Sequence, residues 1–265
     1  MIDQIPQISL VGNPNSGKST IFNLLTGKNQ KTGNWSGVTI DKKSGFFEKE
    51  HKKYQLIDLP GIYSLDSAIS KSEDEKITRK NIIENQSKIF INIIDASNLE
   101  KSLFLTTELI DLEQPMILVL NKIDLARKNN IFIDTQRLSG ILGLKIIKMD
   151  AQNEQNIVEL KNAITDICQQ KDLAIRKVEF NQKITQSIDV LSKKKDLNRW
   201  QILEYLKNFE VNLDSKSNFT IDEIKVIQHN SGQKIDFNLI NDRYKFINKI
   251  LISILRKDSI FKHKI

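Results

Sequence analysis

Residues 12–19 constrain the fold of this chain most, because they match the phosphate-loop pattern G-x-x-x-x-G-K-[ST]. An apolar run at 8–11 precedes them and a helix-like stretch at 20–25 follows, which is the strand–loop–helix context that the motif needs. Glycine lets the backbone curl until successive N–H groups point at phosphate oxygens, and the positive end of the helix favours the same charge. We expect nucleotide contacts from Asn13, Pro14, Asn15, Ser16, Gly17, Lys18, Ser19 and Thr20. Within this set Lys18 is expected to reach the outer phosphates and the Ser19 hydroxyl to ligate Mg²⁺.

A second motif, Asn121-Lys122-Ile123-Asp124, follows the apolar run at 116–120. The carboxylate of Asp124 can accept hydrogen bonds from N1–H and the 2-amino group of guanine, a pair of donors that adenine lacks. Asn121 is expected to bond the purine edge and tie this loop to the phosphate loop, while the stem of Lys122 covers the base. Paired charge-assisted bonds discriminate strongly, so the motif predicts a preference for guanine.

Between these motifs lies Asp58-Leu59-Pro60-Gly61, again after an apolar run. Asp58 is expected to hold Mg²⁺ through a water, and the N–H of Gly61 to bond the γ-phosphate, where a side chain would prevent close approach. Thr39 stands where a loop threonine could complete the Mg²⁺ shell, although a threonine that opens a strand is the usual alternative. The order of these motifs is typical of a small GTPase domain.

The residue after Gly61 is Ile62, where many GTPases place a glutamine that orients the attacking water. Isoleucine has no polar group for this task, so another group must supply charge at the transition state. A monovalent cation bound by the carboxamide of Asn15 is one interpretation, and simple capping of the phosphate loop by Asn15 is the other. We expect the catalytic residues to be Asn15, Lys18, Thr39 and Gly61.

Three segments together resemble the cytosolic G domain of the bacterial ferrous iron transporter family FeoB. They are residues 12–18, Gly-Asn-Trp-Ser-Gly-Val-Thr at 33–39 and Asp-Leu-Pro-Gly-Ile-Tyr-Ser-Leu at 58–65. The resemblance is close over 1–170 and looser over 171–265, where the family carries a helical domain that slows GDP release.

The resemblance implies that Asn15 helps to bind an activating K⁺, with backbone carbonyls from Gly33 to Trp35 completing the shell of that ion. One departure concerns the loop after the sixth strand, where the family usually has Ser-Ala or Thr-Ala and this chain has Asp150-Ala151-Gln152. The N–H of Ala151 can still bond the 6-oxo group of guanine, but the carboxylate of Asp150 places negative charge near the base.

Composition and charge limit the other classes of function. One cysteine, Cys168, excludes a disulfide framework, and three separated histidines make no metal-ligand cluster. No run approaches the roughly 20 apolar residues of a membrane-spanning helix, and no secretory signal opens the chain. Residues 1–170 hold 21 basic and 21 acidic residues, so the net charge of +7 lies in 171–265, where it favours an anionic membrane surface over nucleic acid.

The pattern of apolar residues predicts an α/β P-loop GTPase domain of Ras-like fold over 1–170, with a mixed, mostly parallel sheet. The pattern predicts an all-α domain over 171–265, and the resemblance implies that this domain is regulatory, similar to a GDP-dissociation inhibitor. We expect strands at 7–11, 37–47, 53–58, 89–95, 116–121 and 145–149, and helices at 18–26, 73–85, 100–111, 134–142 and 155–169.

The motifs and the resemblance together predict a slow, K⁺-activated GTPase that binds GTP or GDP, Mg²⁺ and K⁺. Its nucleotide state is expected to be coupled to Fe²⁺ uptake. The expected partners are a membrane domain after this chain, small accessory proteins of the same system and further copies of the chain, with no nucleic acid. The resemblance implies a soluble part at the cytoplasmic face of the bacterial inner membrane. Two rivals stay open: a slow GTP-sensing switch, which Ile62 and Asp150 favour, and a ribosome- or RNA-associated GTPase.

Overall fold

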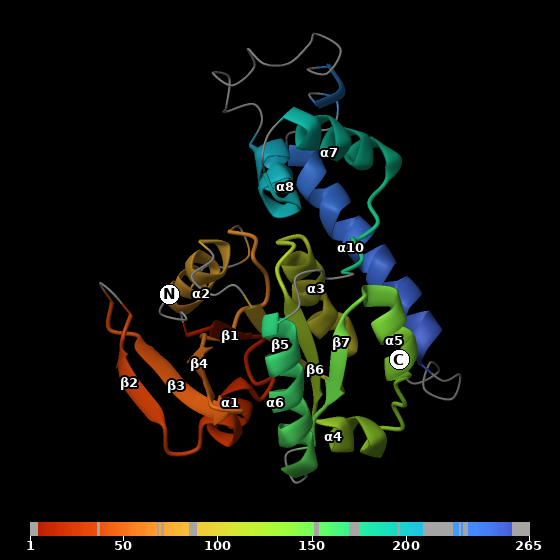
Figure 1. The fold of residues 1–265 in the computed structure, drawn as a ribbon. Helices are drawn as coiled ribbons and strands as arrows, with labels where there is room; N and C mark the ends of the chain where they lie inside the picture. Colours follow the sequence, from red (N-terminus) through yellow and green to blue (C-terminus); the bar gives the residue numbers. More distant parts are fainter. Residues whose placement is uncertain are drawn as a thin grey trace.

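A seven-stranded sheet organises the computed structural model, with strand order β2-β3-β4-β1-β5-β6-β7 (Figure 1). The structure describes residues 5–35, 38–67, 69, 72–84, 89–150, 154–169, 175–194, 197–208, 225–227, 229 and 233–255. The strands are β1 (Gln7–Val11), β2 (Gln30–Asn34), β3 (Asp41–Lys49), β4 (Lys52–Asp58), β5 (Ile89–Asp95), β6 (Met116–Asn121) and β7 (Lys145–Lys148). The expected mixed, mostly parallel α/β sheet is therefore confirmed.

The central strands are parallel and the first edge is antiparallel. β1 pairs in parallel with β4 and β5, and β5–β6 and β6–β7 continue in the same sense. Nearly every residue of β5 and β6 is buried, which explains their continuous apolar sequence, because helices cover both faces of a parallel sheet. Parallel strands bring their carboxyl ends to one edge, and that edge is where the motif loops begin.

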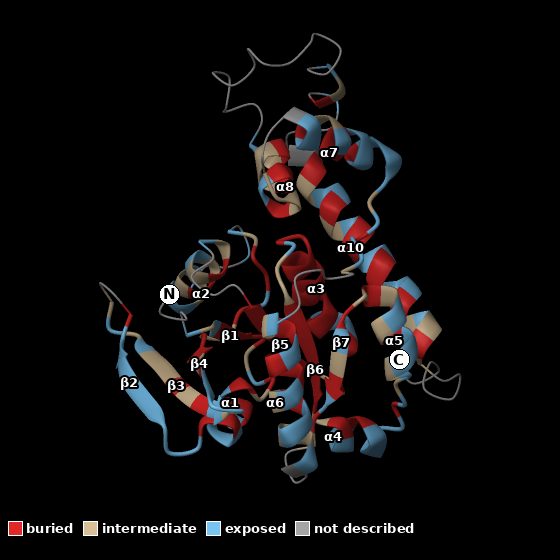
Figure 2. Cartoon of the chain, viewed as in Figure 1, coloured by how far each residue is buried: buried red, intermediate tan, exposed pale blue. Residues whose placement is uncertain are grey.

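Helices cover the two faces of the sheet with separate apolar cores. On one face lie α1 (Lys18–Thr26) and α6 (Glu154–Gln169), whose buried residues join a core that includes Phe22 and Ile164. On the other lie α2 (Glu73–Ile83), α3 (Leu99–Ile110), α4 (Ile123–Lys128) and α5 (Thr135–Leu142). Their core includes Leu103 and Leu138. Figure 2 shows these buried stripes facing the sheet.

The antiparallel edge differs from the expectation. The predicted strand at 37–47 begins only at Asp41, and an unpredicted strand, β2, pairs antiparallel with it from Gln30 to Asn34. All five residues of β2 are exposed and polar, so its sequence has no alternation from which a strand could be predicted (Figure 2). Pairing with β3 alone makes this segment a strand. The short helix α4 was also missed, since six residues are too few for a periodic stripe.

The C-terminal part is helical, as predicted, with α7 (Gln182–Lys194), α8 (Arg199–Lys207) and α10 (Gln233–Ile254). Ile188 of α7, Leu203 of α8 and Leu239 of α10 form a small core of their own. The later turns of α10 run down beside the sheet domain, where Ile247 and Ile250 join the core above α3 and α5 (Figure 1). None of the helices in the described ranges has both the length and the apolar character needed to cross a membrane.

A buried charge cluster fixes this packing. Asp111, at the end of α3, is fully buried and meets Arg243 of α10 at 2.6 Å and Arg199 of α8 at 2.9 Å. Arg243 also donates to the carbonyl of Thr107 at 2.8 Å. Two cations therefore offset one carboxylate, and the three elements are held in one relative position.

Replacing Arg243 with methionine should remove the strongest pair and leave the Asp111 carboxylate buried with only Arg199. Breaking a buried ion pair costs about 3–5 kcal/mol, so we expect a loss of that order in the free energy of unfolding, measured in urea. Lys249→Met is the control, because its pair with Glu179 is exposed and should change stability by less than about 1 kcal/mol. Equal effects of the two substitutions would contradict the role of the cluster.

Candidate functional site

The phosphate loop connects β1 to α1 at the carboxyl edge of the sheet. Gly17 ends it in a left-handed conformation with φ 95°, and Asn15 has φ 62°, a value that asparagine tolerates better than most residues. A Cβ on Gly12 would lie 2.2 Å from the carbonyl oxygen of Ile93, and one on Gly17 would lie 2.0 Å from the Asn121 amide. Space thus requires glycine at both positions, and the dihedral angle requires it at Gly17 as well.

Lys18 lies under this loop rather than in solvent. Its Nζ donates to the carbonyl oxygens of Gly12 at 3.0 Å and Asn13 at 2.9 Å. Burial lowers the pKa of the Lys18 ammonium to about 8, and the Asp58 carboxylate opposes this shift. An anion above the loop would favour the charged form, so the site is suited to a phosphate.

Ser19 and Asp58 form the second part of the site. The Ser19 hydroxyl donates to Oδ2 of Asp58 at 2.8 Å. Burial raises the pKa of Asp58, although the Ser19 hydrogen bond and the charges of Lys18 and Lys43 lower it. The other oxygen, Oδ1, is buried and has no hydrogen-bond partner among the described residues. This hydroxyl–carboxylate pair with an unpaired oxygen fits the oxygen ligands that Mg²⁺ prefers.

The Asp58–Gly61 segment lies directly on the phosphate loop. A Cβ on Gly61 would lie 2.8 Å from the backbone of Pro14, so glycine is needed for this contact. The next N–H, that of Ile62, donates to the carbonyl of Gly12 at 3.2 Å. The Ile62 side chain is fully buried and has no polar group that could face the loop.

A hollow of about 530 Å³ joins these segments. Its wall contains residues from the phosphate loop, from the stretch around Thr39 and from the Asp58–Gly61 segment. These are Pro14, Asn15, Lys18, Ser19, Thr39, Ile40, Asp41, Lys43, Asp58, Leu59, Pro60, Gly61 and Asp74. All four expected catalytic residues, Asn15, Lys18, Thr39 and Gly61, therefore border one space.

The Asn121 motif joins the phosphate loop from the end of β6. The Asn121 side chain donates to the carbonyl of Ser16 at 2.8 Å, as the sequence predicted. Lys122 has φ 59°, and its ammonium meets Asp95 at 2.7 Å. Asp124 is exposed in the first turn of α4. Burial raises the pKa of Asp95, but hydrogen bonds from Lys122 and Ser97 outweigh it, so the pKa is below its usual value.

Asp95 was missed by the sequence reading, although a polar residue that ends the apolar run of β5 was the available signal. Asp150 follows β7, and its backbone N–H donates to the side chain of Asn156 at 3.1 Å. Ala151 and Gln152 lie outside the described residues. Thr20 is exposed on α1 and does not border the hollow.

Residues 33–35, whose backbone carbonyls are the expected K⁺ ligands, lie in and directly after strand β2 rather than in a loop. Gly33 belongs to β2 and pairs with Lys42, so the expected loop is wrong at this position. Trp35 is buried just beyond the strand, and its backbone N–H bonds the carbonyl of Ile40 at 2.9 Å. Neither Gly33 nor Trp35 borders the hollow beside Asn15. Antiparallel pairing holds the segment at the sheet edge.

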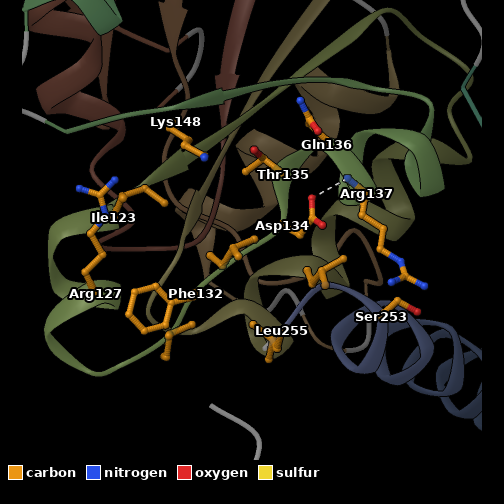
Figure 3. A pocket seen from close by; sticks show the side chains of 13 residues that line it. Ile123, Arg127, Phe132, Asp134, Thr135, Gln136, Arg137, Lys148, Ser253 and Leu255 are labelled. Carbon is orange, nitrogen blue, oxygen red and sulfur yellow. Dashed lines mark hydrogen bonds between the residues drawn. The ribbon is translucent and has the colours of Figure 1, made fainter. Parts of the chain in front are cut away.

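A larger hollow of about 670 Å³ lies elsewhere, beside α4, α5 and the end of α10 (Figure 3). Arg127, Phe132 and Lys148 line this hollow. Asp134 also lines it, but its side chain is the N-cap of α5 and accepts a hydrogen bond from the Arg137 backbone N–H at 2.9 Å. Phosphate-loop residues do not contribute to its wall. The motif residues therefore mark the smaller hollow as the candidate site.

A mostly parallel sheet with this loop, a Mg²⁺-suited pair and the Asn121 motif defines a P-loop GTPase domain. The family model described as Ferrous iron transport protein B matches residues 6–164. The chain belongs to this family.

Curated relatives agree with the family. The Fe(2+) transporter FeoB of Escherichia coli K12 is 41% identical over 187 residues, which cover 70% of this chain and 24% of that protein. FeoB of Salmonella typhimurium LT2 is 44% identical over 158 residues, covering 59% of this chain and 20% of that protein. The chain thus spans about a quarter of the length of the curated relatives it matches.

Solved structures extend the similarity over the helical part. The cytosolic domain of L. pneumophila FeoB has a TM-score of 0.74 and 30% identity, covering 95% of this chain and 100% of that one. The cytosolic domain of T. maritima FeoB in its GMPPNP form has a TM-score of 0.80 and 27% identity, covering 96% and 100%. The GTPase fold followed by a helical part is therefore confirmed.

Adding a methyl group at Gly17 should disable the phosphate loop. Gly17→Ala would place Cβ 2.0 Å from the Asn121 amide at φ 95°, so we expect loss of measurable binding of a fluorescent guanine nucleotide. Gly140→Ala is the matched control, because nothing lies within 4 Å of its Cβ on α5. That change should raise helix stability by about 0.5–1 kcal/mol and leave binding intact. Normal binding by Gly17→Ala would contradict this account of the loop.

Proposed function

We propose that this chain binds and hydrolyses GTP as the regulatory domain of a ferrous iron transporter. The observation that carries the proposal is the hollow of about 530 Å³, where Lys18, Ser19 and Asp58 meet the Gly61 backbone. The T. maritima relatives, solved in GMPPNP and GDP forms, support a guanine nucleotide as the ligand.

Within this proposal the phosphate loop holds the β- and γ-phosphates. The loop N–H groups surround the phosphate oxygens, and Lys18 exchanges its bonds to the carbonyls of Gly12 and Asn13 for the phosphate charge. Asn13, Pro14, Ser16 and Thr20 complete the proposed phosphate contacts. The N–H of Gly61 bonds the γ-phosphate, because the absent side chain allows its backbone to lie against Pro14.

Ser19, Thr39 and Asp58 would hold Mg²⁺, with Asp58 acting through a water. Bound there, Mg²⁺ would neutralise negative charge on the phosphate oxygens. The Ser19 hydroxyl would turn its oxygen from its bond with Asp58 toward the ion. Thr39 is exposed at the rim of the same hollow, so it can approach without disturbing the core.

Asn15 is the proposed ligand of an activating K⁺. Asn15 has a left-handed backbone and an exposed side chain, and it borders the same hollow as Gly61. A cation at this position would offset charge that develops between the β- and γ-phosphates. Carbonyls of Gly33 and Trp35 would complete its shell only if the β2 end leaves β3, since the two strands are paired here.

Guanine is the proposed base, read by Asp124 with Asn121 and Lys122. The Lys122–Asp95 ion pair holds the lysine stem beside the base position, where it can cover one face. The backbone N–H of Ala151 would bond the 6-oxo group, with Asp150 and Gln152 beside it.

The rest of the proposal concerns the whole transporter. Residues 1–170 would form the GTPase domain and 171–265 a helical domain that slows GDP release. Nucleotide state would control Fe²⁺ passage through a membrane domain, with this chain at the cytoplasmic face of the bacterial inner membrane. Small accessory proteins and further copies of the chain are the other proposed partners, and nucleic acid is not one.

A slow GTP-sensing switch is the second candidate. The full burial of Ile62 favours it, because the residue after Gly61 cannot orient a water by its side chain. Such a switch would bind GTP tightly and wait for a partner before hydrolysis.

Turnover in equimolar KCl and NaCl tests the cation. Because Asn15 supplies the proposed ligand oxygen, GTP hydrolysis should be at least about tenfold faster in KCl, and Asn15→Ala should remove that difference. Asn241→Ala, which changes an exposed carboxamide on α10, should behave as wild type. Equal, very slow rates in both salts would favour the switch instead.

Inosine diphosphate, which lacks the 2-amino group of guanine, tests the base contact. Wild type should bind GDP more tightly than IDP, and Asp124→Ala should weaken GDP binding by about 10²-fold or more while reducing the GDP–IDP difference. Affinities measured by calorimetry decide this. An unchanged preference in Asp124→Ala would show that another group reads the base.

A further inference from the structure

A buried carboxylate on α3 holds the segment that follows Gly61. Oε1 of Glu108 accepts from the Ser64 hydroxyl at 2.7 Å, and Oε2 accepts from the backbone N–H of Leu65 at 2.7 Å. Glu108 is 3% exposed, so these bonds are shielded from water. Hydrogen bonds inside a protein, away from water, are electrostatically stronger than the same bonds in water.

The same short segment is fixed at both ends. At its start the N–H of Ile62 donates to the phosphate-loop carbonyl of Gly12 at 3.2 Å. At its end Arg79 of α2 donates to the carbonyl of Leu65 at 2.6 Å. Glu108 bonds Ser64 and Leu65 at the second of these points, so its position helps to set the path of the backbone leaving Gly61.

Glu108 also faces the helical part. It borders a cavity of about 10 Å³, room for no more than one water, together with Asp66, Lys207, Asp236 and Arg243. Burial raises the pKa of Glu108 to about 7, although Arg243, the bonds from Leu65 and Ser64, and Lys207 lower it. Keeping a carboxylate this far from water costs free energy, and packing against apolar neighbours does not need an ionisable side chain at this position.

We propose that Glu108 is a positioning residue for GTP hydrolysis, holding the Ser64–Leu65 backbone so that Gly61 and Ile62 keep their places over the phosphate loop. The inference rests on the proposed GTPase function. It follows from the absence of a polar group on Ile62, because backbone must then orient the attacking water, and backbone geometry depends on what anchors it. Glu108 acts through that backbone and touches no phosphate.

Two substitutions separate positioning from folding. Glu108→Ala removes both acceptors, and we expect kcat for GTP to fall about tenfold or more while the Kd for GDP changes less than about twofold. Glu108→Gln keeps the shape and one acceptor oxygen, so it should retain at least about a third of wild-type kcat. Glu159→Gln, which removes an exposed carboxylate on α6, is the control and should match wild type.

A double-mutant cycle tests the contact itself. Ser64→Ala and Glu108→Ala are combined, and kcat is measured for both single variants and the pair. Because one hydrogen bond joins the two side chains, the second substitution should add little to the first. Thermal unfolding is measured in parallel, and Ser64→Ala, which removes one of the two bonds to Glu108, keeps the test valid if Glu108→Ala does not fold.

The outcomes distinguish this inference from the function on which it rests. Lowered kcat with unchanged GDP affinity, partial rescue by glutamine and non-additivity would support it. Wild-type kcat in a folded Glu108→Ala protein, or in Ser64→Ala where Glu108→Ala does not fold, or additive losses in the cycle, would overturn the inference while leaving the GTPase intact. Absence of turnover in wild type would overturn the proposed function and this inference together.

Discussion

One hydrogen bond holds the two ends of the candidate site together. The amide of Asn121 donates to the carbonyl of Ser16 across 105 residues of sequence, and its nitrogen occupies the space where Gly17 would otherwise carry a Cβ. The bond forms because β1, β5 and β6 lie in that order in the sheet, so the loops after β1 and β6 converge. The absence of a side chain at Gly17 in the phosphate loop thus makes room for the side chain of Asn121 in the second motif.

Much of the fold was predictable because its information is local. The strands at 7–11, 89–95 and 116–121 have buried apolar runs, and those boundaries agree with the structure. β2 could not be predicted, since its five exposed polar residues form a strand only by pairing with β3. The misplaced start of β3 has the same cause, because the end of a strand depends on where its partner ends.

The residues of the candidate site likewise fall into two groups, those that a short motif predicts and those that it does not. Lys18, Ser19 and Asp58 come together as their motifs predicted, although their roles with nucleotide and metal stay predictions. Asp95 and Glu108 belong to no short motif, and their partners Lys122 and Ser64 lie 27 and 44 residues away. A single sequence identifies such residues only after the tertiary structure brings their partners within reach.

The long helix α10 takes part in two apolar cores, one on each side of the predicted domain boundary. Its first turns belong to the small helical core, and its later turns place Phe246, Ile247 and Ile250 in the core above α3. Each such side chain contributes about 1.5–3 kcal/mol when buried. A protein cut after residue 170 would therefore expose an apolar groove on its sheet domain, although the cut falls between the predicted domains. The predicted boundary near residue 170 thus does not coincide with a break in apolar packing, because side chains from both sides of it share one core.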